Sequence, residues 1–241
     1  SRSSAASDVY KRQVQELYEA DSVPEFYPDP KISRLRFLGG ASNHWANNTS
    51  PFSPIDFEKR DWLEHSGWPI SYNEMAPYYQ KAAMYCQTGD DGYSSEHWLP
   101  SMGLTNLLAE AKFSRLGIAK ASLPPTRFYV SHGKPLVESD NVKLYTYANV
   151  VDLEFDETDK RIISATFTSY NGKQHKVVAD RFVLSMGGME NARMLVLFNK
   201  KYRNKIGNKN DIVGRYFMDH PTMNAAHLIS DITKLNSMSR F

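Results

Sequence analysis

The residues best suited to chemistry lie in the segment 36–45, which reads RFLGGASNHW. An apolar run stops at Gly39 and Gly40, and paired glycines let a backbone adopt positive φ and approach a ligand without a Cβ in the way. Small polar side chains, an imidazole and an indole follow at once, an order that suits a chain running along a flat aromatic cofactor with polar edges. The alternative is a tight turn between a buried strand and a loop. The predicted contacts are Gly39, Gly40, Ser42, Asn43, His44 and Trp45.

A second glycine pair follows an apolar stretch in the segment 181–193, RFVLSMGGMENAR. The paired glycines Gly187 and Gly188 let the chain pass close to a ligand. A plain strand-to-helix turn is the alternative.

Together with a third segment at 211–221, DIVGRYFMDHP, these blocks resemble in order three segments of the glucose-methanol-choline (GMC) oxidoreductases. The first block continues through 51–62 and 66–71, PFSPIDFEKRDW and SGWPIS. The resemblance runs from about Lys31 to Met223 and is weakest between Asp90 and Asn141. It implies an FAD-dependent enzyme that oxidises the CH–OH group of an alcohol or sugar by hydride transfer to flavin N5. It also implies that the backbone at Val150 meets the adenine of FAD. For the second block it implies a strand over 181–185, a close approach to the same cofactor at Gly187 and Gly188, and a helix that starts near Glu190.

The tetrapeptide at 42–45, SNHW, is similar to the STHW of the pyranose oxidase branch, in which that histidine is bonded covalently to the flavin 8α-methyl carbon. The resemblance implies a possible tether through His44, with a non-covalent flavin neighbour as the alternative. Ala46 stands where that branch has a threonine beside flavin N5, and it completes the predicted cofactor contacts.

Two hallmarks of GMC proteins have no match in this sequence: the Gly-x-Gly-x-x-Gly turn that seats the FAD pyrophosphate, and the segment with the catalytic histidine pair. Residues 3–13 resemble an in-frame translation of a sequencing-library adapter, so residues 1–13 are set aside as an artefact. We therefore expect an internal fragment, inactive alone, with no catalytic residue assigned. Another flavoprotein reductase of the same fold and a non-catalytic binding or structural protein remain the alternatives.

Helical periodicity positions the first block. Ser71 and Glu74 have capping-box spacing ahead of apolar residues that recur at three and four, which predicts a helix ending near Gly89. Pro77 requires that this helix begin near Asn73 or kink early. We expect a loop over 90–104 and a second helix over 105–116.

Strand periodicity positions the second block. Residues 142–151 predict a strand, followed by a β-meander over 152–156, 162–170 and 174–179 that turns at Asn171-Gly172. With the resemblance, the expected fold is mixed α/β, an incomplete two-dinucleotide-binding flavoprotein fold with part of a substrate domain. The expected divisions are an FAD-binding segment at 14–89, a partial substrate or cap segment at 90–140, FAD-binding strands and helix at 141–200, and the start of a substrate domain at 201–241.

Composition excludes several classes of protein. With 41% hydrophobic, 12% aromatic and 23% charged residues, the chain is too apolar for disorder and too polar for a membrane protein. A net charge of +2 favours no nucleic-acid partner, and the seven histidines show no metal-ligand spacing. The single Cys86 can form no intrachain disulfide, and the cytoplasm is the favoured location. The expected partner is a small alcohol or sugar, while the substrate and the electron acceptor stay open.

Overall fold

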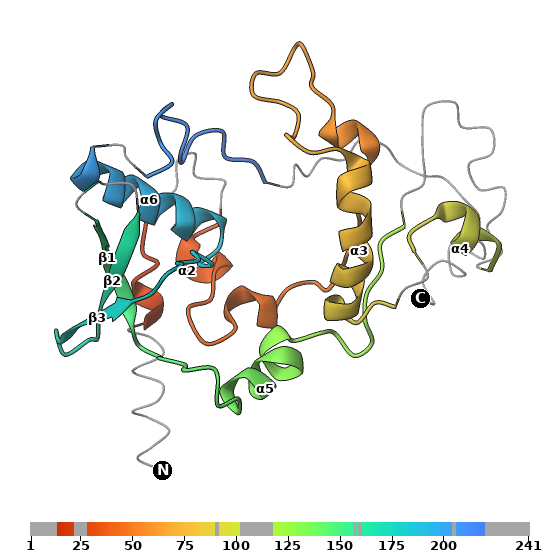
Figure 1. Cartoon of the computed structure of the whole chain (residues 1–241). Coiled ribbons are helices and arrows are strands. Elements are labelled where there is room, and N and C mark those ends of the chain that lie inside the picture. The colour runs from red at the N-terminus through yellow and green to blue at the C-terminus, as the bar shows by residue number, and fades with distance from the viewer. Residues whose placement is uncertain are drawn as a thin grey trace. The chain divides into compact units, whose positions relative to one another are not determined.

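The computed structural model describes residues 14–21, 28–89, 92–101, 118–156, 158, 161–203 and 206–219. The chain divides into two compact units, Ser1–Lys143 with Ser230–Phe241 and Leu144–Ile229 (Figure 1). The first unit is helical where it is described, and the second combines a sheet with one helix, which confirms the mixed α/β class.

The described elements of unit 1 are short helices joined by loops. Apart from one bridge between Thr49 and Lys120, its described residues contain no β-pairing. In chain order the elements are α2 (Pro30–Ser33), the 3₁₀ helices η1 (Gly40–Asn43) and η2 (Pro54–Phe57), α3 (Tyr72–Cys86), α4 (Ser95–Ser101), the π-helix η3 (Tyr129–Gly133) and α5 (Lys134–Val137).

Helix α3 begins where its capping signal predicts. Ser71 is the N-cap: its backbone N–H donates to the Glu74 carboxylate at 2.8 Å, and its hydroxyl accepts the Glu74 N–H at 3.3 Å. Pro77 lies inside the helix, where it removes one backbone hydrogen bond without ending the helix. The end comes three residues earlier than predicted, because Gln87 adopts the left-handed conformation with φ +57°.

The loop predicted over 90–104 is wrong for residues 95–101, which form α4. The Ser94 carbonyl accepts the N–H groups of His97 and Trp98, each at 3.2 Å. The Lys120 ammonium lies 5.3 Å from the Tyr93 ring centroid and 5.4 Å from that of Trp98. Contacts with a residue more than twenty positions away support this helix, and local composition does not reveal them. The helix predicted over 105–116 lies outside the described residues.

Unit 2 contains the predicted β-meander. Strands β1 (Asn149–Phe155), β2 (Ile162–Thr168) and β3 (Gln174–Val178) pair antiparallel in the order β1-β2-β3. The turn at Asn171-Gly172 is confirmed: Gly172 has φ +77° and donates its N–H to the Ser169 carbonyl at 3.0 Å. Helix α6 (Gly188–Tyr202) starts two residues before the predicted Glu190.

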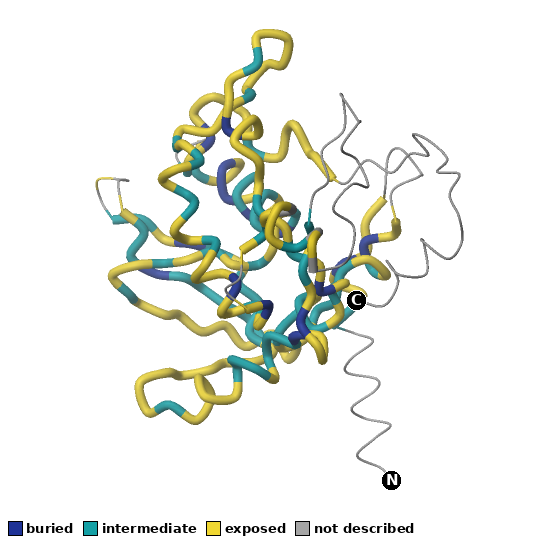
Figure 2. The backbone as a smooth tube through the Cα atoms, turned by 90° about the vertical axis from the view of Figure 1, so that its right-hand side faces the viewer, coloured by how far each residue is buried: buried dark blue, intermediate teal, exposed yellow. Residues whose placement is uncertain are grey.

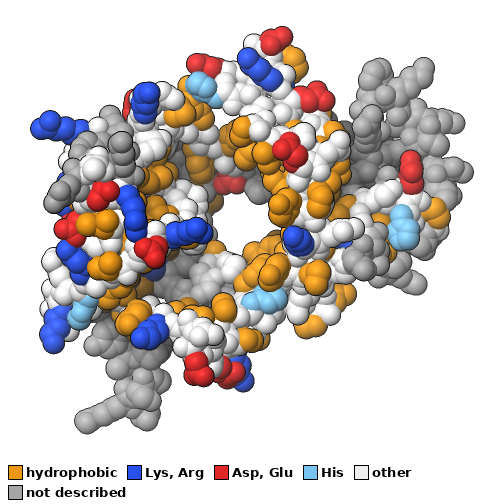
Figure 3. Space-filling model, viewed as in Figure 1, with side chains coloured by type: hydrophobic (Ala, Val, Ile, Leu, Met, Phe, Trp, Pro, Cys, Tyr) orange, Lys and Arg blue, Asp and Glu red, His pale blue; other side chains and the backbone are white. Residues whose placement is uncertain are grey.

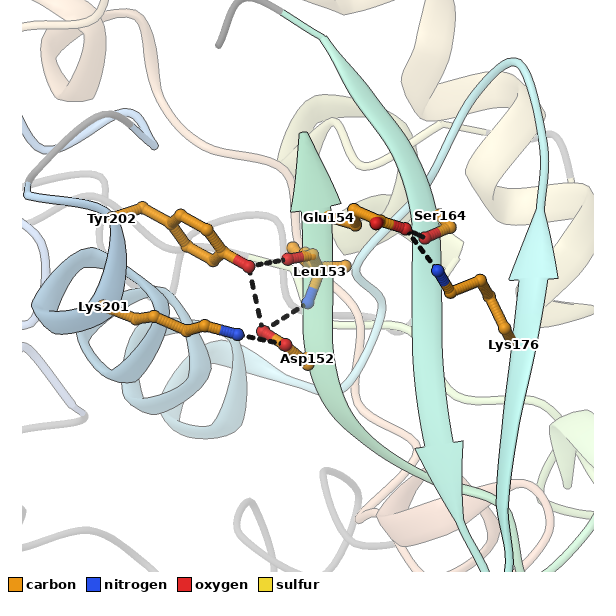
Figure 4. A network of polar contacts seen from close by, with 7 residues as sticks. All are labelled: Asp152, Leu153, Glu154, Ser164, Lys176, Lys201 and Tyr202. Atoms are coloured by element: carbon orange, nitrogen blue, oxygen red, sulfur yellow. Dashed lines mark hydrogen bonds and ion pairs between the residues drawn. The ribbon is translucent and has the colours of Figure 1, made fainter. Parts of the chain in front are cut away.

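One face of this sheet is apolar and the other is polar. Leu153, on the apolar face, forms a core with Met194 and Phe198 of α6. On the other face the Glu154 carboxylate accepts hydrogen bonds from the Ser164 hydroxyl and the Lys176 ammonium, both at 2.6 Å (Figure 4). Ser164 is only 1% exposed, so the sheet is covered at this position on the Glu154 side as well. Figure 2 shows that buried stretches are short and scattered through the described residues.

Two predicted strand segments are not strands. Residues 142–148 and 181–185 are irregular, and β1 begins only at Asn149. A strand requires a neighbouring chain for its backbone hydrogen bonds, and no described segment pairs with either stretch. The Val183 side chain, in the second stretch, is 84% exposed. The alternating pattern at 142–148 and the family resemblance at 181–185 thus each predicted a strand that is not formed.

Candidate functional site

Both glycines of the first pair adopt the left-handed conformation, as the sequence predicts. Gly39 has φ +88° and Gly40 has φ +55°. A Cβ at Gly39 would lie 2.2 Å from the Asn43 amide nitrogen and 2.8 Å from the Tyr129 Cβ. A Cβ at Gly40 would come no closer than 3.7 Å, to the Leu35 carbonyl oxygen. The space beside Gly39 is therefore filled by the protein's own side chains, while Gly40 is open.

The polar side chains after the glycines bond to the backbone. Ser42 donates its hydroxyl to the Gly39 carbonyl at 2.5 Å, which tightens η1. Asn43 donates its amide to the Leu38 carbonyl at 3.0 Å and accepts the Tyr129 N–H at 3.2 Å. Both side chains thus fix the shape of the turn.

Trp45 is anchored and His44 is exposed. The Trp45 indole N–H donates to the Thr126 carbonyl at 2.8 Å, and its ring lies 5.7 Å from that of Phe128. Arg127 donates to the Trp45 carbonyl at 3.3 Å. The His44 imidazole is exposed, with the Phe37 ring edge-on at 5.8 Å. Ala46 follows, also exposed.

A buried polar cluster, which we call the Asn47 cluster, follows this segment and consists of Asn47, Ser122 and Thr126, exposed by 2%, 6% and 1%. Asn47 donates its amide to the Ser122 carbonyl at 2.8 Å and accepts from the Ser122 hydroxyl at 3.1 Å and the Thr126 N–H at 3.2 Å. Thr126 donates its hydroxyl to the Cys86 carbonyl at 2.7 Å.

Burial raises the pKa of the Cys86 thiol, so this cysteine stays protonated at neutral pH.

The sequence did not reveal the Asn47 cluster as part of the candidate site. Ser122 lies 75 positions after Asn47, and Thr126 lies 79 positions after it. Neither Ser122 nor Thr126 belongs to a recognisable motif. The one signal in the sequence was the residue type at position 47. Asparagine is enriched at left-handed backbone positions, and Asn47 has φ +66°.

In unit 2 the second glycine pair forms an open turn. Gly187, with φ +88°, caps α6, and added Cβ atoms at Gly187 and Gly188 would meet nothing within 4 Å. Asn191 holds the approach to this turn: it donates its amide to the Leu184 carbonyl and accepts the Met186 N–H, both at 3.0 Å. The hydrogen bonds of Asn191 therefore position Gly187 and Gly188 although residues 181–185 do not form a strand.

Val150 lies in β1 opposite Phe167, partly buried against the Leu153 core. The register shifts between Val150 and Asp152, which marks a β-bulge. Beside it, Asp152 accepts hydrogen bonds from Lys201 and Tyr202 of α6 (Figure 4). The hydrogen bond with Asp152 raises the pKa of Lys201. These contacts fix β1 to the end of α6.

Seven predicted contact residues, from Gly39 to Ala46, therefore lie on one short segment of unit 1. The other three, Val150, Gly187 and Gly188, belong to unit 2. The described residues of unit 1 also form a shallow hollow of about 570 Å³, which none of the predicted contacts lines. The described residues contain no group of three His, Cys, Asp or Glu side chains suited to a metal ion.

No helix within the described ranges has both the length and the apolar character required to cross a membrane.

Comparisons with known proteins find relatives that are named as dehydrogenases. No family model matches it. The fructose dehydrogenase large subunit of Gluconobacter japonicus is 26% identical over 228 residues, 78% of this chain and 41% of that protein. The 2-methyl-1,2-propanediol dehydrogenase of Mycolicibacterium austroafricanum is 24% identical over 248 residues, 82% of this chain and 44% of that protein. The oxygen-dependent choline dehydrogenase of Staphylococcus epidermidis is 25% identical over 209 residues, 75% of this chain and 36% of that protein.

All three relatives are named as dehydrogenases, and their names give fructose, 2-methyl-1,2-propanediol and choline. The chain spans less than half the length of each of these relatives.

Proposed function

We propose that this chain is the flavin-holding part of a GMC-type, FAD-dependent oxidoreductase that oxidises the CH–OH group of an alcohol or sugar. The observation that carries the proposal is the similarity to three dehydrogenases over 75% to 82% of the chain. The three motif blocks that resemble GMC proteins support FAD as the cofactor.

The residues present fit a flat cofactor at two places. Gly187 and Gly188 leave their backbone uncovered, since a Cβ at either would meet nothing within 4 Å. The His44 imidazole is exposed on a turn whose backbone is fixed by hydrogen bonds. Gly39 has a different role, because the space beside it is filled by Asn43 and Tyr129.

A bound flavin supplies the hydride acceptor, at N5. Each unit offers its own flavin contacts under this proposal. In unit 1, Gly40 allows close backbone approach, and His44 and Ala46 are exposed beside the turn. In unit 2, Gly187 and Gly188 allow the same approach. Ser42, Asn43 and Trp45 hold that turn in shape through their hydrogen bonds to backbone. We assign none of these residues a catalytic role.

The first test is the source DNA, which we expect to encode a Gly-x-Gly-x-x-Gly strand-turn upstream and a His–Asn or His–His pair downstream in the same reading frame. The encoded full-length protein should then purify yellow and reduce its flavin when an alcohol or sugar is added. A second glycine-rich nucleotide motif and reduction by NADPH would instead indicate a reductase. A colourless protein that binds no FAD would indicate a non-catalytic role.

His44 is either tethered to the flavin 8α-methyl carbon, as in the pyranose oxidase branch, or a non-covalent neighbour. Denaturing the full-length protein distinguishes the two forms, because a tethered flavin stays with the polypeptide and a free flavin separates from it. His44→Ala is the matched variant: with a tether, it releases all colour on denaturation while the wild type releases none. Complete release from the wild type rejects the tether.

A further inference from the structure

His44 is held from both sides by the segment 126–129 while its own ring stays exposed. On one side Asn43 accepts the Tyr129 N–H at 3.2 Å, and on the other Trp45 donates its indole N–H to the Thr126 carbonyl at 2.8 Å. An exposed side chain on a backbone fixed at both neighbouring residues is the arrangement expected of a group presented to a ligand.

The attachment continues through Asn47. Its amide oxygen accepts from the Ser122 hydroxyl and the Thr126 N–H, and its amide nitrogen donates to the Ser122 carbonyl. Asn47 therefore joins its own loop to the same stretch that receives the Trp45 indole. A buried amide with its partners in place specifies one conformation, because any other leaves buried polar groups without hydrogen bonds.

The same stretch is attached further along both chains. Thr49 and Lys120 exchange two backbone hydrogen bonds, at 2.8 and 2.9 Å, and the Thr126 hydroxyl donates to the end of α3 at the Cys86 carbonyl. Segment 118–129 is thus joined to the loop after His44 at several separate points.

We infer that Asn47 is a positioning residue: through Ser122 and Thr126 it sets the direction in which His44 faces the flavin. The inference rests on the proposed function in one respect, since it takes the flavin to be the ligand of His44.

The test is Asn47→Gly in the full-length protein. Glycine accepts φ +66° without strain, so this variant removes the buried side chain and its hydrogen bonds without straining the folded backbone. Asn48→Gly is the matched control, because Asn48 is the exposed next residue and undergoes the same substitution. If Asn47→Gly does not fold, Ser122→Ala replaces it and removes the hydroxyl that bonds to Asn47 and Thr126.

The first readout is hydrogen exchange by mass spectrometry. We expect Asn47→Gly to increase exchange at least tenfold in peptides that cover 41–46 and 126–129, and Asn48→Gly to change it less than twofold. The second readout is the visible circular dichroism of the bound flavin, which should change in the Asn47 variant and not in the control. A loss of stability alone does not alter this spectrum in the folded fraction.

The two proposals fail in different ways. A wild type that binds no flavin removes the proposed function, while hydrogen exchange still tests the attachment of His44. If the wild type binds flavin but Asn47→Gly leaves exchange in 41–46 and the flavin spectrum unchanged, the positioning role of Asn47 is rejected and the proposed function stands.

Discussion

Position 39 must be glycine because of its neighbours as well as its backbone. The left-handed φ of +88° is unfavourable for other residues, and the Asn43 amide occupies the place of a Cβ. The sequence predicted the left-handed glycine pair correctly. It could not predict that Tyr129, ninety positions along the chain, packs against one of the two glycines, because that contact depends on the fold.

Gly39→Ala should therefore destabilise the protein by about 2–3 kcal/mol, from backbone strain together with displacement of Asn43 and Tyr129. The measurement is urea-induced unfolding followed by circular dichroism. Gly92→Ala is the control in the same unit: it has φ +73° but nothing within 4 Å of an added Cβ, and should cost about 1 kcal/mol. Equal losses in the two variants would show that the clash contributes nothing.

At the scale of elements, the sequence predicted correctly those helix ends and turns that are stabilised by residues close together in the chain. The Ser71–Glu74 capping box gave the start of α3, and Asn171-Gly172 gave the turn between β2 and β3. Helix α4 was missed because Lys120 supports it from outside the segment. The strand predicted over 181–185 was wrong because an extended apolar stretch still requires a pairing partner.

The contacts of Glu154 on the sheet should make the stability of the fold depend on pH. Hydrogen bonds from Lys176 first and Ser164 second lower the pKa of Glu154. A lowered pKa in the folded state means that the carboxylate adds stability above the ordinary glutamate pKa of about 4.3. This contribution disappears as the pH falls through the lowered value.

We expect Glu154→Gln to reduce the loss of stability on acidification, measured as unfolding midpoints in urea between pH 6 and pH 3. Lys176→Met should raise the pKa of Glu154 towards its ordinary value, as followed by NMR titration of the carboxyl carbon. An unchanged pKa in Lys176→Met would contradict the assigned cause. Both side chains are half exposed, so the effect should weaken in high salt.

At the scale of the whole molecule, many large apolar side chains are exposed. Trp62, Val183 and Met218 are each 84% exposed, and Tyr78, Met84 and Tyr85 on α3 are all more than half exposed. Figure 3 shows apolar side chains gathered over α3. Exposed apolar surface that gathers in one place marks a site where further protein or a ligand binds.

The connection between the units should be open to proteases. The boundary falls between Lys143 and Leu144, and residues 141–147 are all exposed. Brief trypsin treatment should yield a fragment that begins at Leu144, identified by intact mass spectrometry. Lys143→Gln should abolish that fragment and leave other products in place. Protection of this bond in the native wild type would contradict the division into two units.

The edge strand β3 should affect self-association of the protein at high concentration. All five residues of β3 are exposed, and among the described strands β3 pairs only with β2. Such an edge can recruit the same strand of another copy, and a lysine there opposes this by charge repulsion. Lys176 is that lysine, but ionised Glu154 neutralises it. Self-association along β3 should therefore be held back most strongly where the pH lies below the lowered pKa of Glu154, because the protonated carboxyl then no longer masks the repulsion.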